Sequence, residues 1–264
     1  MILPNFIILG AAKAGTTALY HYLKQHPEIG MSRIKETNYL ALKGDPLDFR
    51  GPGDADYIKR FTITTEAGYL DQFADCSGKK AIGEASPLYL YSPKAPLEIK
   101  SLLPDAKLIA ILRNPVDRAY SAFLHLTRDN RETTRDFAEA LRLEPARIAD
   151  RWEHIWHYLE MGRYADQLAR YFDLFDRDQM KVYLYRDFRN DPLSIQRDLY
   201  RFLEVADTFT ADVTTRYNAG IPAGERPFFP SEARLMIEEA LGEDIARLEA
   251  MIGRDLSHWR TSPA

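Results

Sequence analysis

The sequence predicts an α/β fold with a P-loop-like parallel sheet flanked by helices and a helical excursion. Short apolar runs alternate with amphipathic stretches through most of the 264 residues, which is the pattern of strands joined by crossover helices. A glycine-containing turn joins the first apolar run to the first amphipathic stretch. From about residue 128 to 160 the pattern is helical and polar, with no strand candidate. We therefore predict one domain over residues 1–264, with the excursion at about 128–160.

The predicted elements alternate along the chain. The strand candidates are residues 6–9, 28–31, 80–84, 107–112 and 180–185. The helix candidates are residues 18–25, 93–103, 116–126, 162–175, 192–203 and 231–251. Residues 44–56, with Gly51-Pro52-Gly53, are predicted to form a surface loop.

Composition sets limits on the class of protein. A chain with 45% hydrophobic and 28% charged residues is typical of a globular protein. The net charge of −4 argues against a general nucleic-acid binder. The single cysteine, Cys76, excludes an intrachain disulfide and fits a reducing compartment. No apolar run reaches the roughly 20 residues of a membrane span, and the first strand begins too early for a signal peptide. We expect a cytoplasmic protein without a membrane span.

Residues 10–17, with the sequence Gly-Ala-Ala-Lys-Ala-Gly-Thr-Thr, follow the first strand and open the first helix. Small residues allow backbone N–H groups to surround an anion, and the helix adds its positive end. The two glycines have the spacing of a Walker A loop, G-x-x-x-x-G-K-[ST]. However, Thr16 stands at the lysine position and Lys13 lies inside the loop. The sequence thus predicts a phosphate-binding loop with a displaced cation.

Polar residues follow four of the predicted strands. They are Lys13 after the first strand, Lys35 and Glu36 after the second, Glu84 after the third and Arg113 after the fourth. Each could be a solvated turn residue or a helix cap when considered alone. Ligands of open α/β sheets bind at the carboxyl ends of the strands, so the shared position of these residues favours a binding site.

The strand ends also bear on the choice between nucleotides. An ATPase or GTPase needs a lysine after the second glycine and an aspartate that holds Mg²⁺. Here Arg113 follows the most apolar strand, and a basic residue suits a second phosphate better than a metal. His154 and His157 lack a partnering Cys or His motif, so we expect them to pack and expect no metal site. The pattern favours a ligand with two separated phosphates.

Two segments of the chain resemble motifs of a known enzyme family. Residues 13–17 resemble the 5′-phosphosulfate loop of sulfotransferases that use 3′-phosphoadenosine 5′-phosphosulfate (PAPS). Residues 113–121, Arg-Asn-Pro-Val-Asp-Arg-Ala-Tyr-Ser, resemble their 3′-phosphate motif. Residues 161–168 and 185–192 extend the similarity, which covers about residues 5–225. The chain is similar to bacterial sulfotransferases and to those that act on glycans such as heparan sulfate.

The resemblance implies a reaction and a set of binding residues. PAPS would be the co-substrate, no metal would be required, and Lys13 would stabilise the charge on the leaving phosphate. Arg113 and Ser121 would bind the 3′-phosphate. Arg216 and Asn218 would contact the nucleotide from a late loop, or belong to an ordinary surface loop. The remaining phosphate contacts would come from Ala14, Gly15, Thr16 and Thr17.

Two glutamates compete for the role of general base. Residues 35–39, Lys-Glu-Thr-Asn-Tyr, resemble the K-E-x-x-[FY] segment in which the glutamate is the base, so we predict Glu36. Glu84 is the competitor, in a segment that often reads G-E-K-S-P. Ala85 stands here at the lysine position of that segment, and Lys35 is a candidate to compensate.

The sequence leaves several alternatives open. A P-loop kinase or hydrolase would show Mg²⁺-dependent turnover of ATP. A non-catalytic nucleotide-binding module would bind its ligand tightly and behave in the same way when Glu36 or Glu84 is replaced by glutamine. The acceptor could be a small molecule or a glycan, with carbohydrate, lipid and secondary-metabolite acceptors all possible. The sequence does not determine whether the group that receives the sulfuryl group is a hydroxyl or an amine, nor does it determine the oligomeric state. Trp152, Trp156 and Tyr158 are predicted to pack in the core or, if the excursion lines the acceptor cleft, to bind an apolar or sugar substrate.

Overall fold

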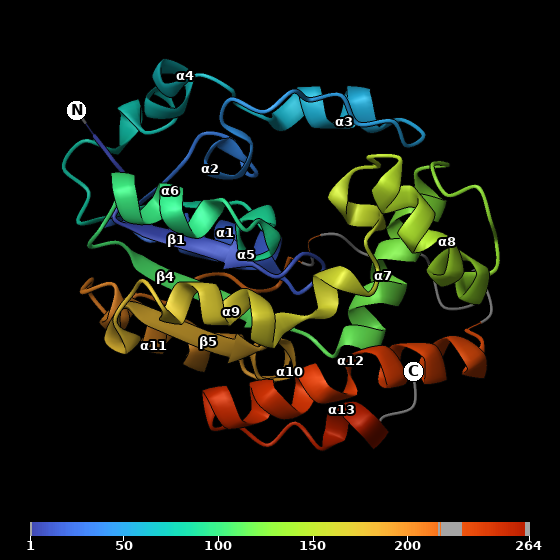
Figure 1. Ribbon diagram of the computed structural model, residues 1–264. Helices are drawn as coiled ribbons and strands as arrows, with labels where there is room; N and C mark the ends of the chain where they lie inside the picture. Colours follow the sequence, from blue (N-terminus) through green and yellow to red (C-terminus); the bar gives the residue numbers. More distant parts are fainter. Residues whose placement is uncertain (1, 216, 218–228, 262–264) are drawn as a thin grey trace. The chain divides into compact units, whose positions relative to one another are not determined.

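A computed structural model describes residues 2–215, 217 and 229–261 of the chain (Figure 1). The chain forms two compact units, each built from segments distant in sequence. Unit 1 comprises Met1–Pro46, Phe61–Leu112 and Arg170–Asn218. Unit 2 comprises Leu47–Arg60, Arg113–Ala169 and Ala219–Ala264. The single domain over residues 1–264 remains a prediction, and each unit is described by itself.

Unit 1 is built around a parallel sheet. In the described part of the chain, the strands are β1 (Phe6–Gly10), β2 (Ile29–Met31), β3 (Ala81–Ala85), β4 (Lys107–Leu112) and β5 (Met180–Leu184). Their spatial order is β2-β3-β1-β4-β5, and every neighbouring pair is parallel. All residues of β1 and β3 are buried, as expected for a sheet covered on both faces. The predicted parallel α/β sheet is confirmed.

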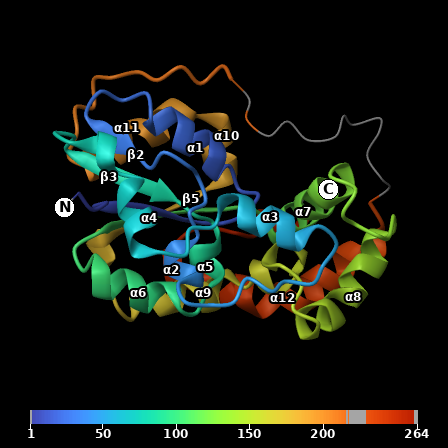
Figure 2. The same ribbon diagram turned by 90° about the horizontal axis from the view of Figure 1, so that it is seen from above.

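Helices of unit 1 cover both faces of this sheet. Figure 2 shows α1 (Thr16–Leu23), α10 (Tyr185–Asn190) and α11 (Pro192–Phe202) on one side of it. On the other side lie α2 (Tyr39–Leu42), α5 (Leu88–Tyr91) and α6 (Ala95–Leu102). The remaining short elements are α4 (Glu66–Asp71), η1 (Ala74–Cys76) and η4 (Arg177–Gln179). The order places the ends of β1 and β3 beside each other, with Ser86 N donating to Ile8 O at 3.2 Å.

Unit 2 is helical, and its described part contains no strand. The predicted helical excursion falls within it and is confirmed as helical. Its elements are α7 (Pro115–Arg128), α8 (Phe137–Ala149), η2 (His154–Trp156), η3 (Glu160–Gly162), α12 (Ser231–Ile252) and α13 (His258–Thr261). Two helices cross the boundary along the chain: α3 (Asp54–Phe61) ends in unit 1, and α9 (Tyr164–Phe172) enters it at Arg170.

A buried aspartate holds residues 47–60 in unit 2. The Asp54 side chain is fully buried and accepts hydrogen bonds from Gly51 N at 2.9 Å and Trp156 Nε1 at 2.9 Å. It also accepts from Glu153 N at 2.7 Å and is ion-paired with Arg131, whose guanidinium lies 4.8 Å from the ring centre of Tyr57. The prediction of a surface loop over residues 44–56 is therefore wrong at its end, because Gly51 and Asp54 are buried.

The aromatic and histidine side chains of the excursion pack inside unit 2. Trp156 and Tyr158 are fully buried, so the packing role predicted for them is confirmed, whereas Trp152 is partly exposed. The rings of His154 and His157 lie 5.5 Å apart. Burial lowers the pKa of His154 to about 3 and that of His157 to about 4. Both histidines are thus neutral packing residues at neutral pH.

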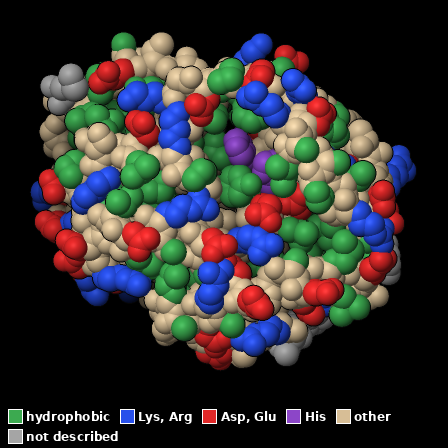
Figure 3. All heavy atoms as spheres, viewed as in Figure 1, with side chains coloured by type: hydrophobic (Ala, Val, Ile, Leu, Met, Phe, Trp, Pro, Cys, Tyr) green, Lys and Arg blue, Asp and Glu red, His purple; other side chains and the backbone are tan. Residues whose placement is uncertain are grey.

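The surface carries charges of both signs. On the face drawn in Figure 3, acidic and basic side chains are interspersed and do not form separate areas. Among the described residues, no helix has both the length and the hydropathy to cross a bilayer. The cytoplasmic location remains a prediction.

Candidate active site

The predicted phosphate-binding loop connects β1 to α1. Ala11 N donates to Ile111 O at 2.8 Å, so the loop leaves the sheet beside the end of β4. Lys13 has a φ of 65° and Gly15, the N-cap of α1, has a φ of 94°. Both values lie in the left-handed region, which turns the chain sharply into the helix. Because Gly15 has no side chain, it leaves the first-turn N–H groups of α1 to another acceptor.

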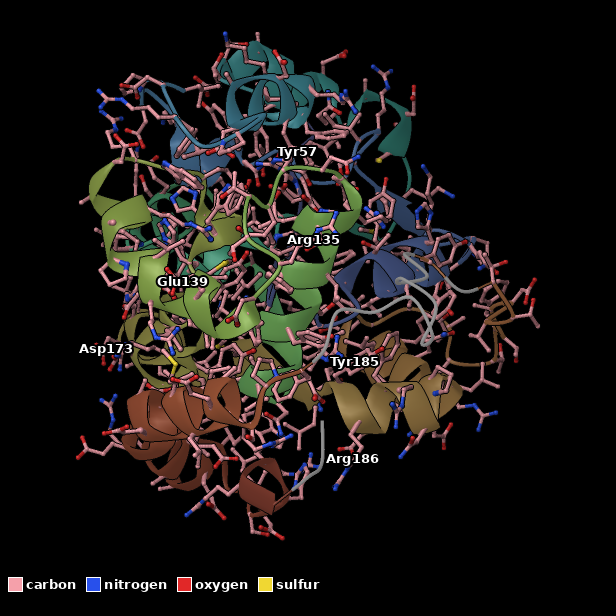
Figure 4. The ribbon with its side chains drawn as sticks, turned by 90° about the vertical axis from the view of Figure 1, so that its right-hand side faces the viewer. Tyr57, Arg135, Glu139, Asp173, Tyr185 and Arg186 are labelled. Atoms are coloured by element: carbon pink, nitrogen blue, oxygen red, sulfur yellow. The ribbon has the colours of Figure 1, made fainter. Side chains whose placement is uncertain are left out.

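Helix α10 packs against this loop. A Cβ atom added to Gly15 would lie 3.1 Å from Tyr185 Cε2 and 3.3 Å from Phe188 Cε1, so only glycine fits without movement. Tyr185 is partly exposed at the start of α10, and the next side chain, Arg186, projects outwards (Figure 4). The sequence did not predict this contact between α10 and the loop, although Tyr185 and Phe188 lie within residues 185–192, which extend the family resemblance.

The loop residues differ in exposure. Ala14 and Thr16 are buried, whereas Lys13, Gly15 and Thr17 are partly exposed. The Lys13 side chain is thus partly exposed on the loop, and the loop combines its positive charge with the N-terminus of an eight-residue helix. This arrangement can bind a phosphate through backbone groups and place a cation beside it.

The second candidate segment, residues 35–38, follows β2. Lys35 Nζ is ion-paired with Glu36 Oε1, and 14% and 32% of the two side chains are exposed. Glu36 has a φ of 68°, and its N–H donates to Ala85 O at 2.9 Å. Burial, followed by the positive charges of Lys24 and Lys35, lowers the pKa of His21 on α1. The positive charge of Lys35 therefore acts on His21, in the helix that follows the predicted phosphate-binding loop.

The third candidate, Glu84, is in a different environment. Its side chain is fully buried near the end of β3. Oε1 accepts hydrogen bonds from Tyr69 Oη at 2.6 Å and Tyr89 Oη at 3.0 Å. Oε2 accepts from Thr37 Oγ1 at 2.6 Å and Ser86 Oγ at 3.0 Å. Burial raises the pKa of Glu84, and the hydrogen bonds from these hydroxyls oppose that rise.

Unit 2 carries the predicted 3′-phosphate motif. Arg113 directly follows the last residue of β4, and its carbonyl accepts a hydrogen bond from Tyr164 Oη at 3.0 Å. The Asn114 side chain caps α7 by accepting from Val116 N at 3.0 Å, and it donates to Trp259 O at 3.1 Å. Ser121 is partly exposed on α7, eight residues beyond Arg113. The sequence did not show that Tyr164 and Trp259 fix the start of this motif.

The last two predicted contacts, Arg216 and Asn218, lie outside the described residues. The segment before them is held against α1. Tyr22 Oη bonds to Val213 O at 3.2 Å and Thr215 O at 3.1 Å, and the ring of Tyr217 stacks on His21 at 4.2 Å. In the described part of the chain, no group of three or more His, Cys, Asp or Glu side chains could hold a metal ion.

Comparisons with known proteins agree with these motifs. Residues 4–209 match the sequence profile of the Sulfotransferase family. A solved structure of a sulfotransferase from Alicyclobacillus acidocaldarius is 41% identical, covers 99% of this chain and 100% of its own, and superposes with a TM-score of 0.90. The chain therefore belongs to the sulfotransferase family, the class of enzyme that its motifs predicted.

Two curated relatives are longer proteins. The membrane-associated sulfotransferase kil1 of Dictyostelium discoideum is 35% identical over 123 residues, which are 47% of this chain and 23% of that protein. Human carbohydrate sulfotransferase 15 is 28% identical over 250 residues, covering 77% of this chain and 44% of that protein. The chain thus spans less than half the length of these relatives.

Proposed function

We propose that the protein transfers a sulfuryl group from PAPS to an acceptor hydroxyl, with Glu36 as the general base. The observation that carries this proposal is the loop between β1 and α1, which in a chain of this family holds Lys13 inside a left-handed turn. Ala14, Gly15, Thr16 and Thr17 would contact the 5′-phosphate at the N-terminus of α1. A P-loop kinase is disfavoured because Thr16 replaces the lysine that reaches the terminal phosphates.

The transfer can be written with its charges balanced. The acceptor oxygen attacks the sulfur as the bond between sulfur and the bridging oxygen breaks, and 3′-phosphoadenosine 5′-phosphate (PAP) leaves. Glu36 takes the hydroxyl proton, while negative charge develops on the departing 5′-phosphate beside Lys13. A positioned base contributes about 10²–10⁴-fold, and a preorganised cation stabilises the charge of the leaving group. The partly exposed Glu36 suits this role because a substrate can reach it.

The 3′-phosphate would be recognised by Arg113, whose planar guanidinium suits phosphate geometry, and by Ser121. Arg216 and Asn218 would contribute from the late loop, as the resemblance implies. For the acceptor, we propose a carbohydrate hydroxyl before an amine, a lipid or a secondary metabolite. The name of the human relative, a carbohydrate sulfotransferase, supports this order.

Calorimetric titration with PAP in the presence of EDTA tests the nucleotide assignment without an acceptor. We expect binding by the wild type and at least tenfold weaker binding by Lys13→Ala and Arg113→Ala. Adenosine 5′-phosphate lacks the 3′-phosphate, so Arg113→Ala should leave its affinity within about twofold while Lys13→Ala weakens it. Binding of ATP with Mg²⁺ that PAP does not displace would instead support the kinase or hydrolase alternative.

A further inference from the structure

We propose that Glu84 is a positioning residue that acts through Thr37 to fix the carboxylate of Glu36. This inference rests on the proposed function, in which Glu36 is the base. It removes Glu84 from the competition for that role and gives the buried carboxylate a different task.

The burial and bonding of Glu84 argue against a role as base. None of its surface is exposed, so an acceptor hydroxyl cannot reach it without displacing the residues around it. Among the described residues, four hydroxyl groups donate to its two oxygens at 2.6–3.0 Å. A carboxylate offers about four lone-pair positions, so these hydroxyls fill its accepting capacity. A proton acceptor for the substrate needs a free position, and Glu84 has none to offer within this network.

The network joins Glu84 to the segment that carries Glu36. Thr37 Oγ1 lies 2.6 Å from Glu84 Oε2, and Thr37 is the residue immediately after Glu36. Ser86 Oγ accepts a hydrogen bond from Asn38 N at 3.2 Å while it donates to Glu84. Tyr89 Oη accepts from Leu40 N at 3.2 Å and also donates to Glu84. The carboxylate therefore orients the hydroxyls that bind residues 37–40.

The backbone of this segment needs such support. Glu36 and Asn38 have φ values of 68° and 52°, in the left-handed region that costs a non-glycine residue about 1 kcal/mol or more. Thr37 lies between them and is fully buried, and its carbonyl accepts a hydrogen bond from Ile63 N at 2.9 Å. Thr37 is thus the anchored residue between two strained ones. Loosening this anchor would let the Glu36 carboxylate move from its position beside Lys35.

A set of variants separates positioning from direct catalysis and from simple structural support. Thr37→Val removes the hydroxyl and keeps the shape, while Thr37→Ser keeps the hydroxyl. Glu84→Gln keeps the size but removes the charge. Tyr200→Phe is the matched control, since it removes one hydroxyl from a fully buried side chain of unit 1 that, within the described part of the chain, donates to Gln196 on the same helix. Each variant is assayed with ³⁵S-labelled PAPS and a panel of unsulfated oligosaccharides, alongside thermal melting.

We expect Thr37→Val and Glu84→Gln to lower kcat about tenfold to a hundredfold, because small displacements of a reacting group have effects of this size. KM for PAPS should stay within about twofold. Thr37→Ser should restore at least half of kcat, and Tyr200→Phe should melt earlier without a change in kcat. Combined with Glu36→Gln, neither Thr37→Val nor Glu84→Gln should reduce kcat further, because both act through the same carboxylate.

Two results would overturn the positioning role. One is a reduction in the double variants equal to the product of the single effects, which would make Glu84 an independent catalytic group. The other is a loss of thermal stability in Thr37→Val and Glu84→Gln with kcat unchanged, which would make the network purely structural. Failure of the proposed function looks different: the wild type would transfer no label to any acceptor in the panel, or Glu36→Gln alone would keep full activity.

Discussion

The ammonium group of Lys35 is ion-paired with the carboxylate of Glu36, the next residue in the chain. Consecutive side chains of an extended segment point in opposite directions, so this pairing needs a change in the backbone. The left-handed conformation of Glu36, with a φ of 68°, provides it directly after β2. The pair places a carboxylate beside a cation where the chain leaves the sheet, and it supports the proposal that Glu36 accepts the hydroxyl proton.

Replacing the proposed base tests this assignment. We expect Glu36→Gln to lower kcat about 10²–10⁴-fold, the usual contribution of a general base, because glutamine cannot accept the hydroxyl proton. PAP affinity, measured by calorimetry, should stay within about threefold. The control is Glu98→Gln, which removes the partner of an exposed ion pair with Lys43 and should leave transfer unchanged. Full activity of Glu36→Gln would exclude it as the base.

The predicted phosphate-binding loop has no room for a side chain at Gly15. We expect Gly15→Ala to weaken PAP binding at least tenfold, because the new Cβ would meet the Tyr185 ring at 3.1 Å in a backbone with a φ of 94°. Gly44→Ala is the matched control: its φ is 75°, but nothing lies within 4 Å of the added Cβ. Gly44→Ala should cost about 1 kcal/mol of stability and leave PAP affinity unchanged. Equal affinities of both variants would refute the role of the contact with α10.

Unit 2 should be sensitive to loss of its buried aspartate. Asp54→Ala removes the closer of the two carboxylates that pair with the buried Arg131, leaving Glu153 Oε2 at 3.9 Å, and it removes the acceptor of Trp156 Nε1. We expect it to reduce the free energy of unfolding by about 3–5 kcal/mol. Asp48→Ala breaks an exposed pair with Arg151 in the same segment and should cost about 0–1 kcal/mol. Chemical denaturation measures both, and equal losses would contradict the structural role of Asp54.

The two buried histidines predict how stability responds to acid. Their pKa values in the folded protein are about 3 and about 4, below the ordinary value of 6.5. Between pH 6.5 and these folded-state pKa values, the unfolded chain therefore binds protons that the folded chain does not. The free energy of unfolding decreases as the pH is lowered through this range. The expected loss between pH 7 and pH 5 is about 1–2 kcal/mol for each histidine.

Comparing the wild type with His154→Phe/His157→Gln isolates this effect. Burial raises the pKa of Glu144 to about 7, so its contribution has the opposite sign: the folded state gains protons first as pH falls. That contribution is common to both proteins and cancels in the difference. The free energy of unfolding of the double variant should depend less on pH between 5 and 7. Parallel curves of unfolding free energy against pH for the two proteins would show that these histidines are protonated as easily in the folded state as in the unfolded state.

Most of the sheet could be predicted from local pattern. Strand β4 was predicted at its observed bounds, Lys107–Leu112, because a six-residue run of mostly apolar residues ends at an arginine and a proline. The turn between β1 and α1 and the start of α7 were also predictable, since glycine spacing and a proline in the first turn act within a few residues. The phosphate-binding role of the turn stays a prediction. The family comparison confirmed the class of enzyme.

Contacts between distant residues could not be predicted in the same way. The short helices α4 and α10 have too few residues for a periodic signal, and α10 packs against a loop some 170 residues earlier. The difference between Glu36 and Glu84 is also tertiary. The sequence places both at the end of a strand, whereas in the structure Glu36 follows β2 and Glu84 lies within β3 (Ala81–Ala85). Complete burial and hydrogen bonds from four hydroxyls, two of them on Tyr69 and Tyr89, distinguish Glu84.

The most direct test of the account is transfer of label from ³⁵S-labelled PAPS to unsulfated oligosaccharides in the presence of EDTA, with wild type and Lys13→Ala compared. The account predicts labelled product with the wild type, no change on adding Mg²⁺, and at least a hundredfold loss in Lys13→Ala with its melting temperature preserved. Label that stays on the nucleotide with the wild type, or equal transfer by both proteins, would contradict it.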